Sequence, residues 1–312
     1  MRASVRRSTL EAIGETPVVR LRKLVSEDMA DVLVKLEYFN PTGSYKDRMA
    51  LSMIEEAEAR GDLKPGMTVV EYTGGSTGSS LAFVCAVKGY RFKVVSSNAF
   101  AREKLQTMRA FGADVHIVHS PSGQITADLI PQMIEVARTL TAEPGTYATD
   151  QLNNRDAIIG YAGIGRELLA QADGPIDVFC GGVGVGGMLL GVAQALREGG
   201  SAARIVALEP AGSPLLTTGR AGSHHVEGTG IGILPPLLTP GSYDEVRAID
   251  ETVARETARR LAREEGIFAG TSSGMNVAAA LMLARELGPG KTVATVAVDS
   301  GLKYLAGDLY AE

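Results

Sequence analysis

Residues 40–48 read Asn-Pro-Thr-Gly-Ser-Tyr-Lys-Asp-Arg, and they carry the most informative pattern of this chain. The Asn-Pro step disfavours helix, and Gly43 permits backbone angles that other residues avoid, so the first half of the stretch predicts a turn. From Tyr45 onward apolar residues recur at helical spacing as far as Gly61, which indicates a helix over residues 45–60. Lys46 is therefore expected in the first turn of a helix.

This position of Lys46 suits a nucleophilic amine. The unpaired N–H groups and the macrodipole make a helix N-terminus positive, so a cation is disfavoured there and the amine loses its proton more easily. A neutral lysine amine can attack a carbonyl and form an imine. The alternative is an ordinary solvated lysine beside Asp47 and Arg48, and the spacing alone does not decide between the two.

The composition indicates a globular α/β protein. The chain has 312 residues, enough for two domains, with 45% hydrophobic residues, 37 glycines and no tryptophan. Its net charge of −5 gives no basic footprint for nucleic acid or an anionic membrane. Cys85 and Cys180 lie in apolar segments without a Cys-x-x-Cys pair, and no apolar run approaches the ~20 residues of a membrane span. We therefore expect a cytoplasmic protein with no nucleic-acid or membrane partner.

Short strands alternate with helices along almost the whole chain, which is the pattern of βαβ units around mainly parallel sheets. The expected strands cover residues 17–22, 32–38, 67–71, 92–96, 114–118, 176–180, 204–209 and 292–298. The expected helices cover residues 45–60, 77–89, 99–111, 126–141, 155–171, 186–198, 251–265 and 273–287. We expect two sheets, one from the strands between 67 and 118 and one from the strands after 176 together with the first two. The Gly-, Pro- and Ser-rich stretch 210–244 is long enough to suggest a functional loop.

A glycine-rich turn at residues 181–188 connects a predicted strand to a predicted helix. Backbone N–H groups in such a turn, aided by the helix dipole, form a cradle for a phosphate. Gly182, Gly184 and Gly187 also fit the dinucleotide-binding fingerprint, and Glu209 ends the next strand where a ribose-binding acid is expected. A nucleotide-dependent oxidoreductase is therefore an alternative, and glycines that only permit close packing of strand and helix are the plain structural explanation.

Two further turns place hydroxyl groups at helix N-termini. Residues 73–78, Thr-Gly-Gly-Ser-Thr-Gly, follow a predicted strand and open a helix, so their N–H and hydroxyl groups can bind a carboxylate. Residues 270–274, Gly-Thr-Ser-Ser-Gly, begin another helix, where Ser272 or Ser273 is at face value an N-cap. Each turn alone indicates little, but three such turns and a helix-start lysine form a rarer combination. The four histidines lie apart from clusters of acids or cysteines, so no metal site is expected.

The identity and order of these motifs resemble the cysteine synthase family of pyridoxal-phosphate enzymes, which shares the tryptophan-synthase-β-like fold. The resemblance covers nearly the whole chain, begins with Ile-Gly-Glu-Thr-Pro-Val-Val-Arg-Leu at residues 13–21, and is close to the family's Schiff-base lysine motif at residues 40–48. It implies an α/β fold of two domains, each an open, mainly parallel twisted sheet flanked by helices. It further implies a smaller mobile domain over residues 40–148 with the substrate-carboxylate loop, a larger domain over 10–39 and 149–312 that binds the cofactor phosphate, and an active site between them.

The resemblance also implies roles for single residues. Lys46 is expected to hold pyridoxal 5'-phosphate as a Schiff base and to be the catalytic residue. Substrate binding is expected at Thr73, Gly74, Gly75, Thr77 and Gln151. Cofactor binding is expected at Lys46, Ser76, Gly184, Val185, Gly186, Gly187, Met188 and Ser272, with Ser272 facing the pyridine nitrogen. Residues 228–232, Gly-Thr-Gly-Ile-Gly, resemble the glycine segment near the site entrance.

This chain departs from the family pattern in both loops. The carboxylate loop of the family usually reads Thr-Ser-Gly-Asn-Thr-Gly, so Gly74 stands for a serine and Ser76 for the asparagine that hydrogen-bonds the cofactor's phenolic oxygen. The phosphate loop usually carries threonines where Val185 and Met188 stand, so the phosphate is expected to be held mainly by backbone N–H groups and the helix dipole. These departures leave the reaction class unchanged and the substrate open.

The implied activity is β-replacement on an O-activated L-serine, either O-acetylserine or O-phosphoserine, through an aminoacrylate, with sulfide as the nucleophile that gives L-cysteine. The implied partners are a small amino-acid substrate, a small nucleophile and a second copy of the chain in a homodimer. A serine- or threonine-type ammonia-lyase of the same fold is the nearest alternative. The alternatives from other classes are the nucleotide-dependent oxidoreductase, which would not need Lys46 or Ser272, and a binding or regulatory protein without turnover.

Overall fold

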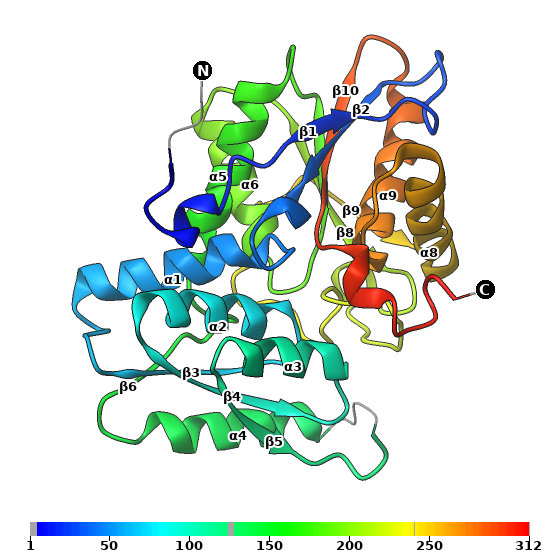
Figure 1. The fold of residues 1–312 in the computed structure, drawn as a ribbon. Helices are drawn as coiled ribbons and strands as arrows, with labels where there is room; N and C mark the ends of the chain where they lie inside the picture. Colours follow the sequence, from blue (N-terminus) through cyan, green and yellow to red (C-terminus); the bar gives the residue numbers. More distant parts are fainter. Residues whose placement is uncertain (1–4, 124–127, 240, 312) are drawn as a thin grey trace. The chain divides into compact units, whose positions relative to one another are not determined.

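The computed structural model describes residues 5–123, 128–239 and 241–311, which are arranged in two compact units (Figure 1). The first unit comprises residues 1–13 and 46–160, and the second comprises residues 14–45 and 161–312. The chain therefore passes from the second unit to the first between Tyr45 and Lys46, and returns between Gly160 and Tyr161. The sequence analysis places these divisions at residues 39/40 and 148/149. The turn 40–45 belongs to the second unit because it is hydrogen-bonded to residues of that unit, as described below.

The first unit contains a four-stranded parallel sheet in the order β5-β4-β3-β6. Its strands are β3 (Thr68–Tyr72), β4 (Arg91–Ser97), β5 (Asp114–Val118) and β6 (Thr146–Ala148). Its helical elements are η1 (Thr9–Ala12), α1 (Lys46–Arg60), α2 (Ser76–Lys88), α3 (Arg102–Ala110) and α4 (Leu129–Thr141). Helices α2 and α3 lie on one face of this sheet and α4 lies on the other (Figure 1). The α4 side is filled by an apolar cluster that we call the first core, formed by Val70, Val95, Leu129, Met133 and Ala137.

The second unit contains a six-stranded sheet in the order β1-β2-β10-β7-β8-β9, in which only the pairing of β1 with β2 is antiparallel. Its strands are β1 (Val18–Arg20), β2 (Asp31–Leu36), β7 (Val178–Gly182), β8 (Arg204–Pro210), β9 (Glu245–Ile249) and β10 (Thr292–Ala297). Its helices are α6 (Gly187–Glu198), α7 (Leu215–Thr218), α8 (Glu251–Arg260), α9 (Thr271–Leu287) and most of α5 (Asp156–Gln171). Short helical turns complete it: η2 (Glu37–Phe39), η3 (Leu261–Glu265) and η4 (Gly301–Tyr304). Helices α8 and α9 lie together on one side of the sheet, and α5 and α6 lie on the other (Figure 1).

Helix α9 is the most buried helix segment of the second unit's core. Its residues from Thr271 to Ala284 are buried with one exception, Met282, and its apolar side chains pack against the strands of the central sheet. Gly274 lies against α8, where an added Cβ would meet the backbone of Ala258 at 2.8 Å, so only glycine allows the two helices to approach this closely. The first turn of α9 is therefore held in place by burial on several sides.

The structure confirms the two sheets and the strands assigned to each of them. It adds β6 and β9, two short edge strands that the sequence analysis did not predict, and the one-turn helix α7 inside the stretch 210–244. The helix predicted over 251–265 ends at Arg260 as an α-helix and continues as the π-helical turn η3. Residues 126 and 127 of another predicted helix lie outside the described residues, and the described part begins at Leu129. Within the described residues, no helix is long and apolar enough to cross a membrane.

Candidate active site

The turn that precedes Lys46 is fixed by hydrogen bonds within the second unit. Asn40 is buried, its Nδ2 donates to Glu37 Oε2 at 3.0 Å, and its Oδ1 accepts from the backbone N–H of Gly14 at 2.8 Å. Farther along, the Gly43 carbonyl accepts from the Ser300 N–H at 3.0 Å, and the Tyr45 N–H donates to the Val298 carbonyl at 3.1 Å. The turn is thus anchored at both ends before the chain reaches Lys46.

Lys46 is the first residue of α1 and is partly buried. Burial lowers the pKa of its amine to about 8, while the nearby Glu71 carboxylate acts in the opposite direction. The sequence analysis expects a lowered pKa from the helix N-terminus, whereas the largest cause in the structure is desolvation. Either way, a substantial fraction of the amine is neutral near pH 8, as nucleophilic attack on a carbonyl requires.

Glu71 is a residue of this site that the sequence analysis missed. It is almost fully buried at the end of β3, where its Oε2 accepts from Thr149 Oγ1 at 2.7 Å and from the Gln151 N–H at 3.1 Å. Its Oε1 accepts from the Tyr72 N–H at 2.9 Å. Burial raises the pKa of this carboxyl to about 7, against the opposing effect of these hydrogen bonds. An acid at the end of an apolar strand, directly before a turn of hydroxyl residues, was the available sequence signal.

The predicted carboxylate turn and Gln151 lie together in the first unit. Thr77 Oγ1 donates to Gln151 Oε1 at 2.8 Å, and the Gly75 N–H donates to Thr73 Oγ1 at 3.1 Å. Helix α2 begins at Ser76, so the N–H groups of a helix N-terminus are available to a bound anion at this turn. The structure thus gathers residues 73–77 and Gln151, whose backbone N–H is held by Glu71, into one cluster.

The predicted phosphate loop connects β7 to α6 in the second unit. An added Cβ at Gly184 would overlap the Gly228 carbonyl, and Gly186 caps α6 with a φ of +86° that favours glycine. Val185 and Met188 are buried. A Cβ added at Gly181 would lie 2.7 Å from the Met188 Cε, so the Met188 side chain packs directly on this glycine. This loop joins a strand to a helix N-terminus and admits no side chain at Gly184. Such an arrangement is suited to hold a phosphate group through backbone N–H donors.

Ser272 is buried in the first turn of α9, and its neighbours tie this turn to two other segments. Ser273 Oγ accepts from the Val298 N–H at 2.8 Å, which links α9 to the end of β10 that also binds Tyr45. Thr271 Oγ1 accepts from the Glu227 N–H at 3.1 Å, directly before the glycine segment 228–232. The start of α9 therefore holds together several predicted site segments of the second unit.

Asn276 makes the link from α9 to the phosphate loop, and the sequence analysis did not single it out. Its side chain is fully buried, its Oδ1 accepts from the Gly182 N–H at 2.8 Å, and its Nδ2 donates to the Val296 carbonyl at 2.9 Å. The Gly230 N–H in turn donates to the Val183 carbonyl at 3.0 Å. The glycine loop is thereby positioned from two sides.

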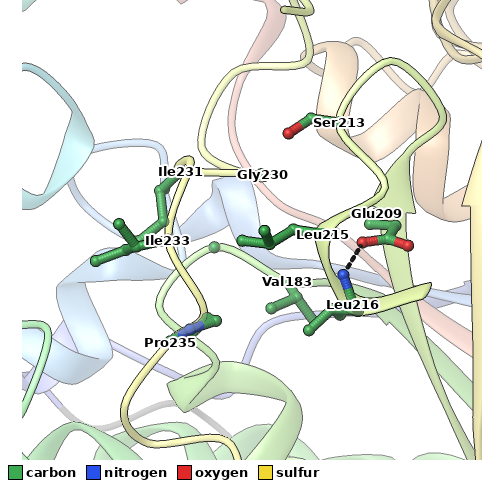
Figure 2. A pocket seen from close by; sticks show the side chains of 10 residues that line it. Val183, Glu209, Ser213, Leu215, Leu216, Gly230, Ile231, Ile233 and Pro235 are labelled. Carbon is green, nitrogen blue, oxygen red and sulfur yellow. Dashed lines mark hydrogen bonds between the residues drawn. The ribbon is translucent and has the colours of Figure 1, made fainter. Parts of the chain in front are cut away.

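A pocket beside the glycine loop tests the dinucleotide alternative. Val183, Gly184, Gly230 and Glu209 are among its lining residues (Figure 2). Glu209, the expected ribose-binding acid, is buried, and its Oε2 accepts from the Leu216 N–H at 2.6 Å, as Figure 2 shows. Its Oε1 accepts from the Thr217 N–H at 3.0 Å and also from the Thr217 hydroxyl. This carboxylate fixes the start of α7, so the dinucleotide reading loses the acid on which it depends.

Comparison with known proteins agrees with this geometry. The family model described as "Pyridoxal-phosphate dependent enzyme" matches residues 9–299. A cysteine synthase of Staphylococcus aureus is 43% identical over 303 residues, covering 96% of each chain. The crystal structure of an O-ureido-L-serine synthase matches with a TM-score of 0.89 and 38% identity, covering 98% of this chain and 96% of that one. A cysteine synthase structure from Entamoeba histolytica matches with a TM-score of 0.93 and 32% identity, covering 100% of this chain and 93% of that one.

The family match spans nearly all of the chain and includes the lysine turn, the glycine loop and the start of α9. The Staphylococcus aureus cysteine synthase also aligns over nearly the whole chain, and its identity of 43% is high enough to establish a common family. Both unit sheets have counterparts in the solved structures, since those structures superpose over almost the whole chain. This chain belongs to the family of pyridoxal-phosphate dependent enzymes.

Proposed function

We propose that this protein is a pyridoxal-phosphate dependent cysteine synthase that acts on O-acetyl-L-serine. The reaction exchanges the acetate group at Cβ for sulfide, so O-acetyl-L-serine and sulfide give L-cysteine and acetate. The observation that carries the proposal is the anchored turn 40–45 directly before Lys46, an amine whose pKa is lowered to about 8. The full-length similarity to a cysteine synthase from Staphylococcus aureus supports the same activity.

The residues that would hold the cofactor are Lys46 at the start of α1, the glycine loop before α6, and Ser272 in the first turn of α9. The backbone N–H groups of residues 184–188 would bind its phosphate, because Val185 and Met188 carry no polar side-chain group at this loop. Ser272 would meet the ring nitrogen, and Lys46 Nζ would form the covalent link. When bound, the cofactor supplies an electron sink for cleavage of the Cα–H bond and loss of the β-substituent. A hydroxyl at the ring nitrogen does not hold it protonated as a carboxylate would, which favours elimination of the β-group over transamination.

The first unit offers the residues that would hold the substrate. The N–H groups at the start of α2 and the Thr73 hydroxyl would bind its carboxylate. The Thr77 hydroxyl would join them by turning its single proton to the carboxylate from Gln151 Oε1, to which it donates at 2.8 Å. Ser76 would contact the cofactor in place of the asparagine that the family uses. Lys46 Nζ, released from the cofactor by the incoming amino acid, would accept the Cα proton as general base.

We further propose that the enzyme works as a cytoplasmic homodimer, as the family resemblance implies. Light scattering coupled to size-exclusion chromatography of the cofactor-loaded protein measures the mass of the assembly directly. A mass of about twice the 32.7 kDa chain supports the dimer, and a mass equal to one chain rejects it.

The experiment that tests the activity follows all products in one reaction. Purified, cofactor-loaded protein is incubated with O-acetyl-L-serine with and without sulfide, and cysteine, acetate, pyruvate and ammonia are measured. We expect cysteine and acetate in equal amounts when sulfide is present, and neither above background with the Lys46→Ala variant. Pyruvate and ammonia in the presence of sulfide would instead identify the ammonia-lyase of the same fold. O-phospho-L-serine in a parallel reaction identifies the preferred leaving group.

A further inference from the structure

The turn 73–78 contains three glycines whose surroundings differ sharply. A Cβ added at Gly74 would overlap the ring carbons of Phe100, and one added at Gly78 would lie 2.5 Å from the Cε of Met108. A Cβ added at Gly75, in contrast, meets no atom of the described chain within 4 Å. Two of the three glycines are therefore covered by side chains from residues 100–108, and the third borders open space.

The Phe100 ring is held in this place by the backbone between β4 and α3. The Phe100 N–H donates to the Ser97 carbonyl at 3.2 Å, and the Ala99 N–H donates to Ser97 Oγ at 3.2 Å. Asn98 between them is tied to Ser120 by two hydrogen bonds of 2.7 and 3.0 Å. The ring packs on the first core and remains only partly buried. Its position is thus fixed from the sheet side, independently of the turn that it covers.

We infer that Phe100 is a positioning residue for the carboxylate-binding turn, because its ring takes the space of a side chain at position 74. The ring occupies the space beside the Cα of Gly74, and as a hydrocarbon it offers no N–H or O–H donor there. The N–H groups and the Thr73 and Thr77 hydroxyls of the turn can then serve an anion only from the open side at Gly75. The inference rests on the proposed function of this turn as the carboxylate site.

Close packing makes a specific prediction about positions 74 and 100. A serine at position 74 cannot be accommodated unless the Phe100 ring moves, because its Cβ would overlap the ring carbons. Closely packed side chains do not admit extra heavy atoms without strain. Removing the ring relieves that overlap but also frees the turn to rearrange. The effects of Gly74→Ser and Phe100→Ala must therefore depend on each other, as expected of residues in direct contact.

The test measures the apparent Kd of L-serine from the change in cofactor absorption of the holoenzyme, together with the melting temperature. The variants are Phe100→Ala, Gly74→Ser and the double variant. Ile130→Ala is the matched control, because Ile130 is also partly buried against the first core. Gly174→Ser is the control for adding a side chain, since an added Cβ there meets no described atom within 4 Å.

We expect Phe100→Ala to raise the Kd of L-serine about tenfold, while Ile130→Ala lowers the melting temperature and leaves the Kd unchanged. Gly74→Ser should lower the melting temperature by more than Gly174→Ser, and the double variant should recover most of that loss. The inference is overturned if Phe100→Ala behaves like Ile130→Ala, or if the effects of the two substitutions are independent. Failure of the proposed cysteine synthesis would appear separately, as wild-type protein that binds L-serine but makes no cysteine from O-acetyl-L-serine.

Discussion

Lys46, which is partly buried, and Glu71, which is almost fully buried, are ionisable groups with opposite pKa shifts. Burial lowers the pKa of Lys46 to about 8 and raises that of Glu71 to about 7, so both titrate close to neutral pH. The Glu71 carboxylate favours the charged form of the Lys46 amine. The protonation of each group therefore affects the chemistry of the other, and each shift has a measurable consequence.

The shift at Lys46 predicts the pH dependence of cofactor attachment. Only the neutral amine reacts, and at pH 7.5 about a quarter of the amine is neutral if its pKa is about 8. We expect the rate of covalent attachment of pyridoxal phosphate to the cofactor-free protein to rise with pH and to level off above about pH 8. Stopped-flow absorbance across pH 6 to 10 measures this rate. A rate that still rises tenfold per pH unit beyond pH 9 would mean that Lys46 is an ordinary solvated lysine.

The shift at Glu71 predicts a pH dependence of stability. Its pKa is raised in the folded protein from 4.5 to about 7, so folding favours the protonated form. The stability from this group is fully present below about pH 4.5 and is lost as the pH rises through about 7. We expect the free energy of unfolding of the wild type to fall over this range, relative to Glu71→Gln, by on the order of 3 kcal/mol. Urea denaturation at a series of pH values measures it, and parallel curves for the two proteins would contradict the prediction.

Helix α9 shows at the scale of an element how the second unit fixes the segments that carry its predicted site residues. Its small residues let it pack closely against its neighbours. Its first turn contains Ser272, together with Ser273, which accepts from the Val298 N–H, and Thr271, which accepts from the Glu227 N–H. Asn276, one turn later, satisfies a backbone donor at Gly182 and a backbone acceptor on β10. Buried backbone groups require such partners, so this one side chain joins the glycine loop to the central sheet.

Replacement of Asn276 by alanine should destabilise the protein and loosen cofactor binding together. The variant leaves the Gly182 N–H and the Val296 carbonyl buried without these partners, which we expect to cost about 2–4 kcal/mol. Gln194→Ala is the control, because it removes an amide that is hydrogen-bonded on the exposed face of α6 and should change stability by less than about 0.5 kcal/mol. Thermal unfolding and cofactor titration measure both effects. Unchanged cofactor affinity in a destabilised Asn276→Ala protein would show that Asn276 supports the fold but not the loop.

The sequence analysis found the elements in which a regular spacing of hydrophobic residues identifies a helix or a strand. Helices such as α1 and strands such as β8 carry enough residues for the spacing to identify them. The missed strands β6 and β9 are edge strands that pair with β3 and β8. Length does not separate them from the predicted strands, because β1 has three residues like β6, and β3 has five like β9. Such strands are specified by their partners more than by their own residues.

The same limit applies to the site at the scale of the whole molecule. Lys46, the residues of the turn 73–78 and Ser272 lie in local motifs, which is why the sequence and the family resemblance could name them. Glu71, Phe100 and Asn276 owe their importance to contacts with residues distant in the chain. Only Glu71 has a local signal, its place directly before a turn of hydroxyl residues, and that signal does not reveal its partners. The passage from one unit to the other between Tyr45 and Lys46 is likewise set by hydrogen bonds to residues 298–300.

The chain as a whole combines a nearly complete family match with two loops that depart from the family pattern. The glycine loop has no polar side chains at Val185 and Met188, so a phosphate bound here would depend on N–H donors alone at these positions. The carboxylate turn keeps its hydroxyls and its tie to Gln151 while a ring from the following segment covers Gly74. The backbone geometry of both loops and the position of Lys46 are thus compatible with the proposed reaction.

The attachment point of the cofactor tests the central claim most directly. Purified, cofactor-loaded protein is reduced with borohydride, digested, and analysed by mass spectrometry for the peptide that carries the cofactor. We predict that the label is on Lys46 and is absent from the Lys46→Ala protein treated in the same way. Labelling of a different lysine in the wild type, or no labelling after cofactor has been supplied, would contradict the role proposed for Lys46 and for the turn that positions it.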